Sequence, residues 1–385
     1  MRKKPVTLET YITLIVFIGV FILFSAIMGI SNFMNTFINT AYYLLTDIAL
    51  WIMAVAVLTG ALGGVFSEFG VISLLNKILS PGTRMIYKLP GVASLGAVTA
   101  YLSDNPAIIS LSREKEFSKQ FKAYQMPVLC NLGTSFGMGL VIAITMISFQ
   151  GKYEGNFMIA TIVGVFASVI GSIVSVRLLT HYSRKFYNIG KDPNPIKVVE
   201  GDEIDRHVRE GSAFNRLLES SLDGGRNGVD IGLQIIPGIL IISTIVILLT
   251  NSMPDSGYTG AAKEGIGLLP FIGKYLLFIF KPLFGFTSPE AIAFPLTSLG
   301  SAGAALGFIP EFLDNGYIGI KEIAVFTAMG TTWSGYLSTH ISMMDSLNAR
   351  KLSGKAILTH TIGGLVSGIA ANYLYMLVAW IFKLA

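Results

Sequence analysis

An acidic residue in the middle of an apolar stretch is the sequence feature with the clearest chemistry. Asp104 stands in the run Ser103-Asp104-Asn105-Pro106, which interrupts the apolar segment 92–111. An acid near the centre of a bilayer costs at least about 2.5–3.5 kcal/mol, so it is expected to face a cavity or a partner. Asp104 could bind sodium, carry a proton or accept hydrogen bonds from a solute. It could also cap a half-helix that begins at Asn105 or Pro106, because Asp is a favoured N-cap residue.

Further polar residues within apolar segments could complete a binding site around Asp104. Serine, threonine and glycine also serve plain helix packing in membranes, so each hydroxyl has two interpretations. Trp333 could stack on a planar solute. The predicted substrate-binding residues are Ser103, Asp104, Asn105, Asn131, Thr134, Ser135, Ser298, Ser301, Thr331, Thr332, Trp333 and Ser334. Asp104 and Asn131 are also the predicted coupling-ion residues, and no metal ligand is predicted.

Two histidines in apolar segments receive structural interpretations. His340 and Asp345 are five residues apart and do not share a helix face well, so a hydrated vestibule is favoured over a proton relay. His360 lies early in the last apolar segment and is interpreted as a packing residue.

The composition places these residues in a membrane protein. Of 385 residues, 52% are hydrophobic and only 13% are charged, whereas about a quarter are charged in soluble domains. One cysteine, Cys130, excludes a disulfide framework and a cysteine-built metal site. The chain has no His-Glu-x-x-His, no P-loop and no Gly-x-Ser-x-Gly motif. We therefore expect neither an enzyme nor an ATP-driven pump, and no cofactor.

The elements that position the polar residues are apolar segments long enough to cross a bilayer, which takes about 20 residues. Seven stretches qualify: 9–28, 41–66, 123–148, 157–181, 229–250, 322–346 and 356–382. Two more, 92–111 and 288–309, are broken by Ser103–Pro106 and by Gly300–Gly303, and are predicted to be re-entrant hairpins. Segments 68–88 and 267–283 are predicted to be interfacial amphipathic helices. The alternative for the two broken stretches is a pair of kinked spans.

Charge placement favours the hairpins. With a cytoplasmic N-terminus and seven crossings, 22 of the 28 lysines and arginines fall on the cytoplasmic side, as the positive-inside rule requires. This predicts a bacterial cytoplasmic membrane protein with its C-terminus outside. The net charge of +5 is then explained by topology, so no nucleic acid partner is expected. The lipid bilayer and a small-molecule substrate are the expected partners, and a homo-oligomer is allowed.

The chain also contains an internal repeat. Residues 79–142 resemble residues 279–339 at an offset of about 197 to 201, and the order of elements is the same in both copies. Their first spans cross in opposite directions, so the copies are predicted to be inverted. The predicted units are an extra N-terminal span (1–40), a first repeat (41–182), a cytoplasmic linker (183–228) and a second repeat (229–385). Inverted repeats with broken helices are typical of secondary transporters.

The first hairpin and the segment after it carry a resemblance to a known domain. Ser103-Asp104-Asn105-Pro106-Ala107-Ile108, the basic stretch 113–122 and Met126-Pro127-Val128-Leu129-Cys130-Asn131 resemble the Gate, or nucleoside-recognition, domain. That domain occurs in concentrative nucleoside transporters and in ferrous-iron transporter B. Asp104 stands near the place of the cysteine in the iron transporter's Cys-Asn-x-Pro-Ala pattern, and the Asn-Glu-Phe signature of nucleoside transporters is absent. The resemblance therefore implies a fold more specifically than a substrate.

The sequence predicts an all-α polytopic membrane protein: an inverted repeat with seven transmembrane helices, two re-entrant hairpins and two interfacial helices. The predicted function is secondary transport of a small polar solute, nucleoside-like or a related metabolite, by alternating access, with Na⁺ or H⁺ as the coupling ion. Two alternatives remain open. One is a Gate-domain scaffold or regulatory component that does not transport, and the other is a metal-ion permease.

Overall fold

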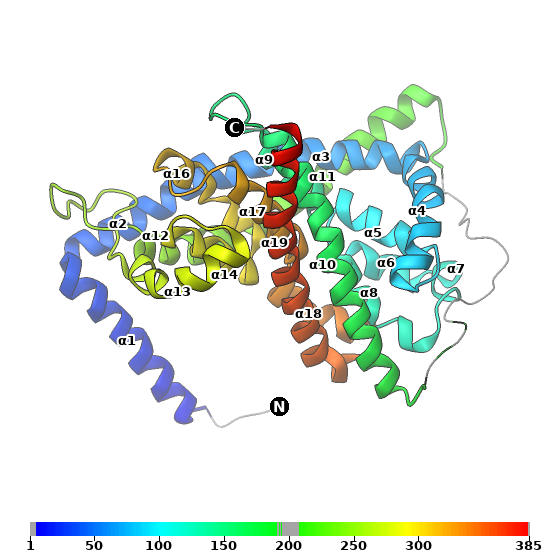
Figure 1. Ribbon diagram of the computed structural model, residues 1–385, viewed down its shortest axis with the longest axis horizontal. Helices are drawn as coiled ribbons and strands as arrows, with labels where there is room; N and C mark the ends of the chain where they lie inside the picture. Colours follow the sequence, from blue (N-terminus) through cyan, green and yellow to red (C-terminus); the bar gives the residue numbers. More distant parts are fainter. Residues whose placement is uncertain (1–4, 191, 193, 195–207, 384–385) are drawn as a thin grey trace.

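The protein is built from helices packed around a central pair. The computed structural model describes residues 5–190, 192, 194 and 208–383. Within these residues no β-strand forms beyond one isolated bridge between Gln150 and Tyr153, so the predicted all-α class is confirmed. Figure 1 shows α10 (Phe157–Phe186) and α19 (Ser353–Phe382), each of 30 residues, side by side near the middle of the molecule.

The first half starts with a helix that lies apart from the body of the protein (Figure 1), α1 (Leu8–Met28). Gly29, with φ +81°, turns the chain into one continuous helix of 39 residues. That helix comprises α2 (Ile30–Tyr43), a π-helical segment (Leu44–Ala49) and α3 (Leu50–Glu68). The predicted start at residue 41 was therefore wrong. Polar residues of α2 interrupt the apolar pattern because they bind a loop: Asn32 and Asn39 donate to the carbonyls of Tyr258 and Gly260.

The next elements form the first broken hairpin. α4 (Val71–Tyr87) precedes α5 (Ala93–Leu102) and α6 (Ala107–Arg113), followed by a short helix, α7 (Lys115–Ser118). The break at Ser103–Pro106 is where the sequence predicts it, and α5 with α6 is called hairpin 1 below. A re-entrant path for hairpin 1 and an interfacial position for α4 stay predictions.

The predicted span 123–148 corresponds to a helical segment of span length, Ala123–Ile147, which is interrupted along its course. It consists of a 3₁₀ turn (Ala123–Gln125), α8 (Val128–Thr134) and α9 (Gly139–Ile147). The chain breaks between the two helices, where Met138 has a left-handed φ of +53°. The apolar pattern continues through this break, so hydropathy alone does not reveal it.

The long polar stretch between the halves is shorter than predicted. α10 runs to Phe186, and α11 already begins at Ala213, so residues 213–228 are helix and not part of a linker. α11 (Ala213–Gly238), a π-helical segment (Ile239–Ser243) and α12 (Thr244–Thr250) form a helix of 38 residues. α11 packs along α3 through small residues, because a Cβ on Gly224 would lie 2.2 Å from the carbonyl oxygen of Gly60.

The second half repeats this order. It contains α13 (Leu268–Phe284), a 3₁₀ turn (Pro289–Ile292), α14 (Ala293–Gly300), α15 (Ala302–Leu306), α16 (Ile309–Asp314), α17 (Ile320–Thr332), α18 (Tyr336–Ser346) and a 3₁₀ turn (Arg350–Leu352) before α19. The break between α14 and α15 falls at Ser301, inside the predicted break. The predicted span 322–346 is divided between α17 and α18, which is a further correction.

Several elements correspond between the halves at nearly the same offset. α4 and α13 both have 17 residues, and α10 and α19 both have 30. Ser103 and Ser301 mark the two hairpin breaks, and Gly137 and Gly335 lie in the two broken spans; both pairs are 198 residues apart (301 − 103 and 335 − 137). The boundaries of the repeats, and their opposite orientation in the membrane, stay predictions.

The helices identify a multi-pass membrane protein. Six helical segments among the described residues are long and apolar enough to cross a bilayer, or seven if the pair Leu268–Phe284 and Pro289–Gly300, bent by 75°, counts as one span. The six segments include six of the seven predicted spans. The seventh, 322–346, is the one divided between α17 and α18.

Candidate functional site

The tip of hairpin 1 lies against two other interruptions of helical backbone. Asn105 is buried at this tip, and its Nδ2 donates to Thr339 Oγ1 in the first turn of α18, at 2.6 Å. The same Nδ2 lies 3.5 Å from Met343 Sδ, one turn further along α18. Hairpin 1 of the first half is thereby attached to the last broken span of the second half.

Glycines at the two broken spans make room for this tip. A Cβ on Gly137, between α8 and α9, would lie 2.8 Å from Asn105 Cβ. A Cβ on Gly335, between α17 and α18, would lie 2.6 Å from Asn105 Nδ2. Gly335 also has φ +62°, a left-handed conformation that glycine adopts without steric cost. Three breaks in the helical backbone therefore meet around one asparagine.

Asp104 stands beside this meeting point and is half-buried. Its Oδ1 accepts a hydrogen bond from the backbone N–H of Asn105 at 2.7 Å. α6 instead has Pro106 at its N-cap, without a side-chain cap, so the alternative in which Asp104 caps the half-helix was wrong. The carboxylate stabilises the tip of the hairpin itself and leaves oxygen lone pairs free for a cation or a solute.

Four of the predicted site residues have a buried polar atom without a hydrogen-bond partner. Burying such an atom unpaired costs about 1–3 kcal/mol, so each one calls for a ligand, an ion or a water molecule. These atoms are Asn105 Oδ1, Ser298 Oγ, Thr331 Oγ1 and Ser334 Oγ. They come from hairpin 1, from α14 and from α17 with the break after it, and α14 packs against both α17 and α18.

Other predicted residues bind within their own helices. Thr134 Oγ1 donates to the carbonyl of Cys130, Ser135 Oγ to that of Asn131, and Thr332 Oγ1 to that of Ala328. Such bonds to a carbonyl four residues back satisfy a hydroxyl without a solute. Thr134 still lies close to hairpin 1, because its Oγ1 is 3.8 Å from Met343 Sδ, the atom that Asn105 also approaches.

Trp333 is engaged inside the protein. Its Nε1 donates to the carbonyl of His360 at 3.2 Å, and its ring packs so closely on α19 that a Cβ on Gly364 would lie 2.1 Å from Cε2. The other neighbour of the indole is Tyr336, with the rings stacked at a centroid distance of 6.3 Å. Stacking on a solute, which the sequence predicts, would require the indole to leave this position.

The side-chain hydrogen bonds of Asn131 join four helices, its own α8 with α10, α18 and α19. Its Nδ2 donates to Ser175 Oγ in α10 and to Thr359 Oγ1 in α19, at 2.8 and 2.9 Å. Its Oδ1 lies 3.1 Å from His340 Nε2 in α18. His340 is fully buried, so the hydrated vestibule predicted for it was wrong. The hydropathy pattern could not show that His340 is buried, because its partner Asn131 lies in a helix distant in the sequence.

The second hairpin break packs on the scaffold of its own half. Ser301 Oγ accepts from the backbone N–H of Ala304 at 3.1 Å, as an N-cap of α15. A Cβ on Gly238, at the end of α11, would lie 2.9 Å from the same Ser301 Oγ. The Ser243 hydroxyl donates to the carbonyl of Ala304 at 3.1 Å. Ser301 thus packs against the end of α11, and Ala304 binds the π-helical segment after it.

A cavity of about 240 Å³ with a mixed polar and apolar lining opens beside hairpin 1. Ser103 and Thr99 line it from the hairpin, and the small residues of α3 and α11 form its opposite wall. Its polar lining also includes Arg209, Asp223 and Asn227, which the sequence did not indicate. Ser103 is therefore at the boundary between the Asn105 site and this cavity.

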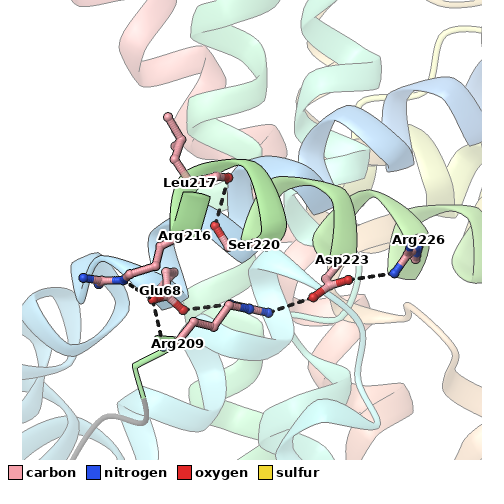
Figure 2. A network of polar contacts seen from close by, with 7 residues as sticks. All are labelled: Glu68, Arg209, Arg216, Leu217, Ser220, Asp223 and Arg226. Carbon is pink, nitrogen blue, oxygen red and sulfur yellow. Dashed lines mark hydrogen bonds and ion pairs between the residues drawn. The ribbon is translucent and has the colours of Figure 1, made fainter. Parts of the chain in front are cut away.

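A clasp of charged side chains, drawn in Figure 2, contributes Arg209 and Asp223 to the lining of this cavity. Glu68, at the end of α3, accepts from Arg209 Nη1 at 2.7 Å and from Arg216 Nε at 2.8 Å. Arg209 Nη2 also reaches Asp223 in α11 at 3.0 Å, and Asp223 binds Arg226 at 2.9 Å. Glu68, Arg209, Arg216, Asp223 and Arg226 are called the Glu68 clasp below. It joins the end of α3 to the start of α11.

The described residues contain no group of three or more His, Cys, Asp or Glu side chains that could hold a metal ion. The cysteine of the chain, Cys130, is buried in α8 with its Sγ 3.9 Å from the carbonyl of His340. The polar groups around Asn105 are hydroxyls, amides and one carboxylate. Such groups can replace the hydration shell of a small polar solute or of an alkali cation.

Comparisons with known proteins identify the fold of this chain but no family to which it belongs. No model of a known protein family matches the chain. The chain is 21% identical over 261 residues to an uncharacterized protein of Alkalihalophilus pseudofirmus. The match covers 66% of this chain and 51% of the relative, so the chain spans about half the length of the curated relative that it matches. The resemblance to the gate domains of ferrous-iron transporter B stays a prediction.

Solved structures of one transporter match along most of the chain. The concentrative nucleoside transporter CNTnw in an inward-facing substrate-bound state has a TM-score of 0.52 at 13% identity, over 85% of this chain and 75% of that one. A CNTnw variant in an outward-facing state has a TM-score of 0.53 at 12% identity, over 86% of this chain and 76% of that one. A CNTnw variant in an intermediate state has a TM-score of 0.54 at 12% identity, over 86% of this chain and 76% of that one. The chain therefore has the fold of the concentrative nucleoside transporter CNTnw.

Proposed function

We propose that this protein is a secondary transporter that moves a small polar solute across a bacterial cytoplasmic membrane by alternating access. The observation that carries the proposal is the meeting of three helix breaks around Asn105. A break leaves backbone N–H and C=O groups without helical partners, and these groups can bind a polar solute inside the membrane. The unpaired oxygens of Asn105, Thr331 and Ser334 add further positions for hydrogen bonds.

The solute that fits this chemistry is neutral and rich in hydroxyl or amide groups. The site has hydroxyl and amide side chains that both donate and accept, and Asp104 is its charged member. A nucleoside or a related metabolite has this character, and the fold shared with CNTnw supports the same class. An anionic solute would have to leave its charge unpaired beside the Asp104 carboxylate, which is costly in a low dielectric.

Alternating access is supported by the arrangement of the repeats. Hairpin 1 and the α17–α18 break come from different halves of the chain, yet they meet at Asn105 and Thr339. Proteins with this fold have been solved in outward-facing, inward-facing and intermediate states. We place the N-terminus and the Glu68 clasp on the cytoplasmic side and the C-terminus outside, because this orientation puts 22 of 28 basic residues inside.

The test is binding followed by uptake. Purified protein is screened by thermal shift against nucleosides, nucleobases and amino acids, with and without sodium. The compound that stabilises most is then radiolabelled and its uptake into proteoliposomes is measured. We expect Asn105→Ala to reduce uptake about tenfold, since one lost solute hydrogen bond of about 1.4 kcal/mol corresponds to that factor.

The matched control is Asn32→Ala. Asn32 also carries a side-chain amide that donates to the opposite half of the chain, at 3.1 Å from the carbonyl of Tyr258, but it lies far along the sequence from the breaks. Uptake by this variant should stay within about twofold of the wild type. Equal losses in the two variants, or no uptake of any compound by the wild type, would overturn the proposal.

A further inference from the structure

The ring nitrogens of His340 both face oxygen atoms that act as acceptors. Nδ1 lies 2.9 Å from the backbone carbonyl of Tyr336, and Nε2 lies 3.1 Å from the side-chain Oδ1 of Asn131. A carbonyl oxygen accepts hydrogen bonds and cannot donate them. Neutral imidazole carries one N–H, so it can satisfy only one of these two contacts. Imidazolium carries two and satisfies both.

The orientation of Asn131 follows from its other partners. Its Nδ2 carries two hydrogens and lies within hydrogen-bond distance of three acceptors, so one hydrogen is shared between two of them: Ser175 Oγ, Thr359 Oγ1 and, at 3.2 Å, the backbone carbonyl of Ala356. The Ala356 carbonyl can only accept, which requires a donor at that position. A flipped amide would place two acceptor oxygens there and would leave the Ala356 carbonyl without this bond. Thr359 Oγ1 donates to carbonyls of its own helix and therefore accepts from Asn131. Asn131 Oδ1 thus points at His340.

The neighbouring His360 satisfies both of its ring contacts in the neutral form, unlike His340. Its Nε2 lies 2.6 Å from the carbonyl of Thr332 and must donate, whereas its Nδ1 lies 2.9 Å from Ser175 Oγ. Ser175 accepts from Asn131 Nδ2, so its own proton is available for His360 Nδ1. A neutral His360 is therefore fully satisfied. One continuous chain of hydrogen bonds runs from His340 through Asn131 and Ser175 to His360, and it has room for one extra proton.

We infer that His340 is the site where this protein binds a coupling proton. The inference rests on the proposed transport function and names the ion of that same cycle. The proton adds to His340 Nε2 from water, makes the ring a cation that donates to Asn131, and leaves by the reverse step. In the forward step one O–H bond of a hydronium ion breaks, one N–H bond forms at Nε2 and a water molecule is left.

The proton site at His340 is connected to the proposed solute site at Asn105 through one peptide unit. Thr339, the residue before His340, accepts the hydrogen bond from Asn105 at the tip of hairpin 1. Burial disfavours the charged form of the His340 ring. The two hydrogen bonds that the charged ring donates favour it. The proton is therefore held only while α18 stays in place against Asn131. Movement of hairpin 1 and α18 as the solute is released would remove an acceptor and expel the proton.

The titratable groups around His340 come from α18 itself and from all but one of the elements that pack on it. α8 brings Cys130 and α19 brings His360, whose ring centroid is 4.9 Å from that of His340. On α18 itself lie Tyr336, at a centroid distance of 5.3 Å, and Asp345, which pairs with Arg350 at the surface. The 3₁₀ turn after α18 adds Lys351, α14 has no titratable residue, and hairpin 1 brings Asp104.

The first test uses ¹⁵N-histidine magnetic resonance and needs no substrate. The chain has four histidines, and a His181→Gln/His207→Gln variant retains only the buried pair. Between about pH 5 and 8, where histidine titrates, one of the two rings should show the pattern of two protonated nitrogens and the other a single neutral tautomer. Asn131→Leu, which removes the Nε2 acceptor, should reduce the imidazolium fraction at a given pH. Two rings that stay neutral over the whole range would overturn the inference.

The second test is uptake driven by a proton gradient in proteoliposomes, with the nucleoside that stabilises the protein most as the probe. One proton per solute allows about tenfold accumulation for a gradient of one pH unit, since one pH unit corresponds to a factor of ten. His340→Gln should lose this response and keep the thermal shift with the nucleoside, whereas exposed His181→Gln should keep both. A gradient response that survives in His340→Gln would overturn the proton site. Absence of uptake by the wild type would instead overturn transport, and the resonance result would still decide on His340.

Discussion

Asn105 and Thr339 are 234 positions apart in the chain, and the amide of the first donates to the hydroxyl of the second at 2.6 Å. The bond attaches the tip of hairpin 1 to the first turn of α18, directly after the left-handed Gly335. Neither half of the chain can form this site alone, because the hairpin belongs to the first half and α18 to the second. The geometry therefore couples the two halves at the point where both backbones are interrupted.

Gly335→Ala should weaken the contact between hairpin 1 and α18. A left-handed alanine costs about 1–2 kcal/mol, and its Cβ would lie 2.6 Å from Asn105 Nδ2, so the hairpin must also shift. We expect a lower melting temperature and loss of solute binding, both measurable by thermal shift. Gly354→Ala in α19 is the control, because open space surrounds that glycine. Equal behaviour of the two variants would show that the tip does not depend on Gly335.

Asp104→Asn separates a coupling role from a structural one. Asparagine keeps an oxygen for the Asn105 N–H, so the fold should be retained and the melting temperature should change little. If the carboxylate takes part in the transport cycle, uptake falls and its dependence on sodium or pH changes. Asp104→Ala, which removes the acceptor as well, should lower stability by about 0.5–1.5 kcal/mol. Wild-type rate and ion dependence in the asparagine variant would exclude a coupling role for Asp104.

The sequence was sufficient to predict the helical class and the hairpin breaks, because these depend on local patterns. Apolar runs of span length and the polar run Ser103–Pro106 are visible without any tertiary contact. The breaks at Gly137 and Gly335 were missed, because apolar residues continue on both sides of them. Their cause is a contact with Asn105, which no local pattern contains.

The buried polar residues were harder to interpret for a related reason. The sequence favoured a hydrated vestibule for His340, because His340 and Asp345 do not share a helix face well, yet His340 is buried against Asn131 from another helix. Residues 213–228 were assigned to a linker because they are polar, with Arg216 and Asp223 among them. Arg216 binds Glu68 at the end of α3, and Asp223 binds Arg209 just before α11, so these charges are compatible with a packed helix.

Gly224→Ala should separate α3 from α11. Its Cβ would lie 2.2 Å from the backbone oxygen of Gly60, and overpacking of this kind costs about 1–3 kcal/mol. We expect a lower melting temperature and a weaker Glu68 clasp, which bridges the same two helices. The adjacent Gly225→Ala is the control, because its Cβ would lie at an ordinary 3.6 Å from Val57. If Gly225→Ala is as destabilising as Gly224→Ala, helix propensity and not the interface is responsible.

Glu264 should make stability fall in acid. It lies in the loop between α12 and α13, where burial alone would raise its pKa, but hydrogen bonds from Thr259, Gly260 and Thr36 hold the pKa below its usual value near 4.5. A depressed pKa in the folded state means that the stabilisation is present above the unfolded value and is lost as pH falls through the folded one. Melting temperatures from about pH 6 to 3 should therefore decline more steeply in the wild type than in Glu264→Gln.

The exposed Glu154→Gln is the control for this titration, since it removes one carboxylate from another loop. Its acid profile should follow that of the wild type. A Glu264→Gln profile that also follows the wild type would show that the hydrogen bonds to Glu264 contribute nothing to the pH dependence.

Topology is tested by cysteine labelling in whole cells. Cys130 is buried and should not react with an impermeant maleimide. Lys119→Cys should be shielded, because Lys119 is exposed after hairpin 1 on the side predicted to be cytoplasmic, and Ser256→Cys should be labelled. Labelling of position 119 from outside would mean that hairpin 1 crosses the membrane. Shielding of position 256 would reverse the proposed orientation of the whole chain.

The most direct measurement is an electron cryomicroscopy structure of the protein in nanodiscs with the solute that stabilises it most. The account predicts density for that solute between the tip of hairpin 1 and the α17–α18 break, within hydrogen-bond distance of Asn105 Oδ1 and of Thr331 or Ser334. Density bound elsewhere, with these oxygens still unpaired and the three breaks still packed on each other, would contradict it.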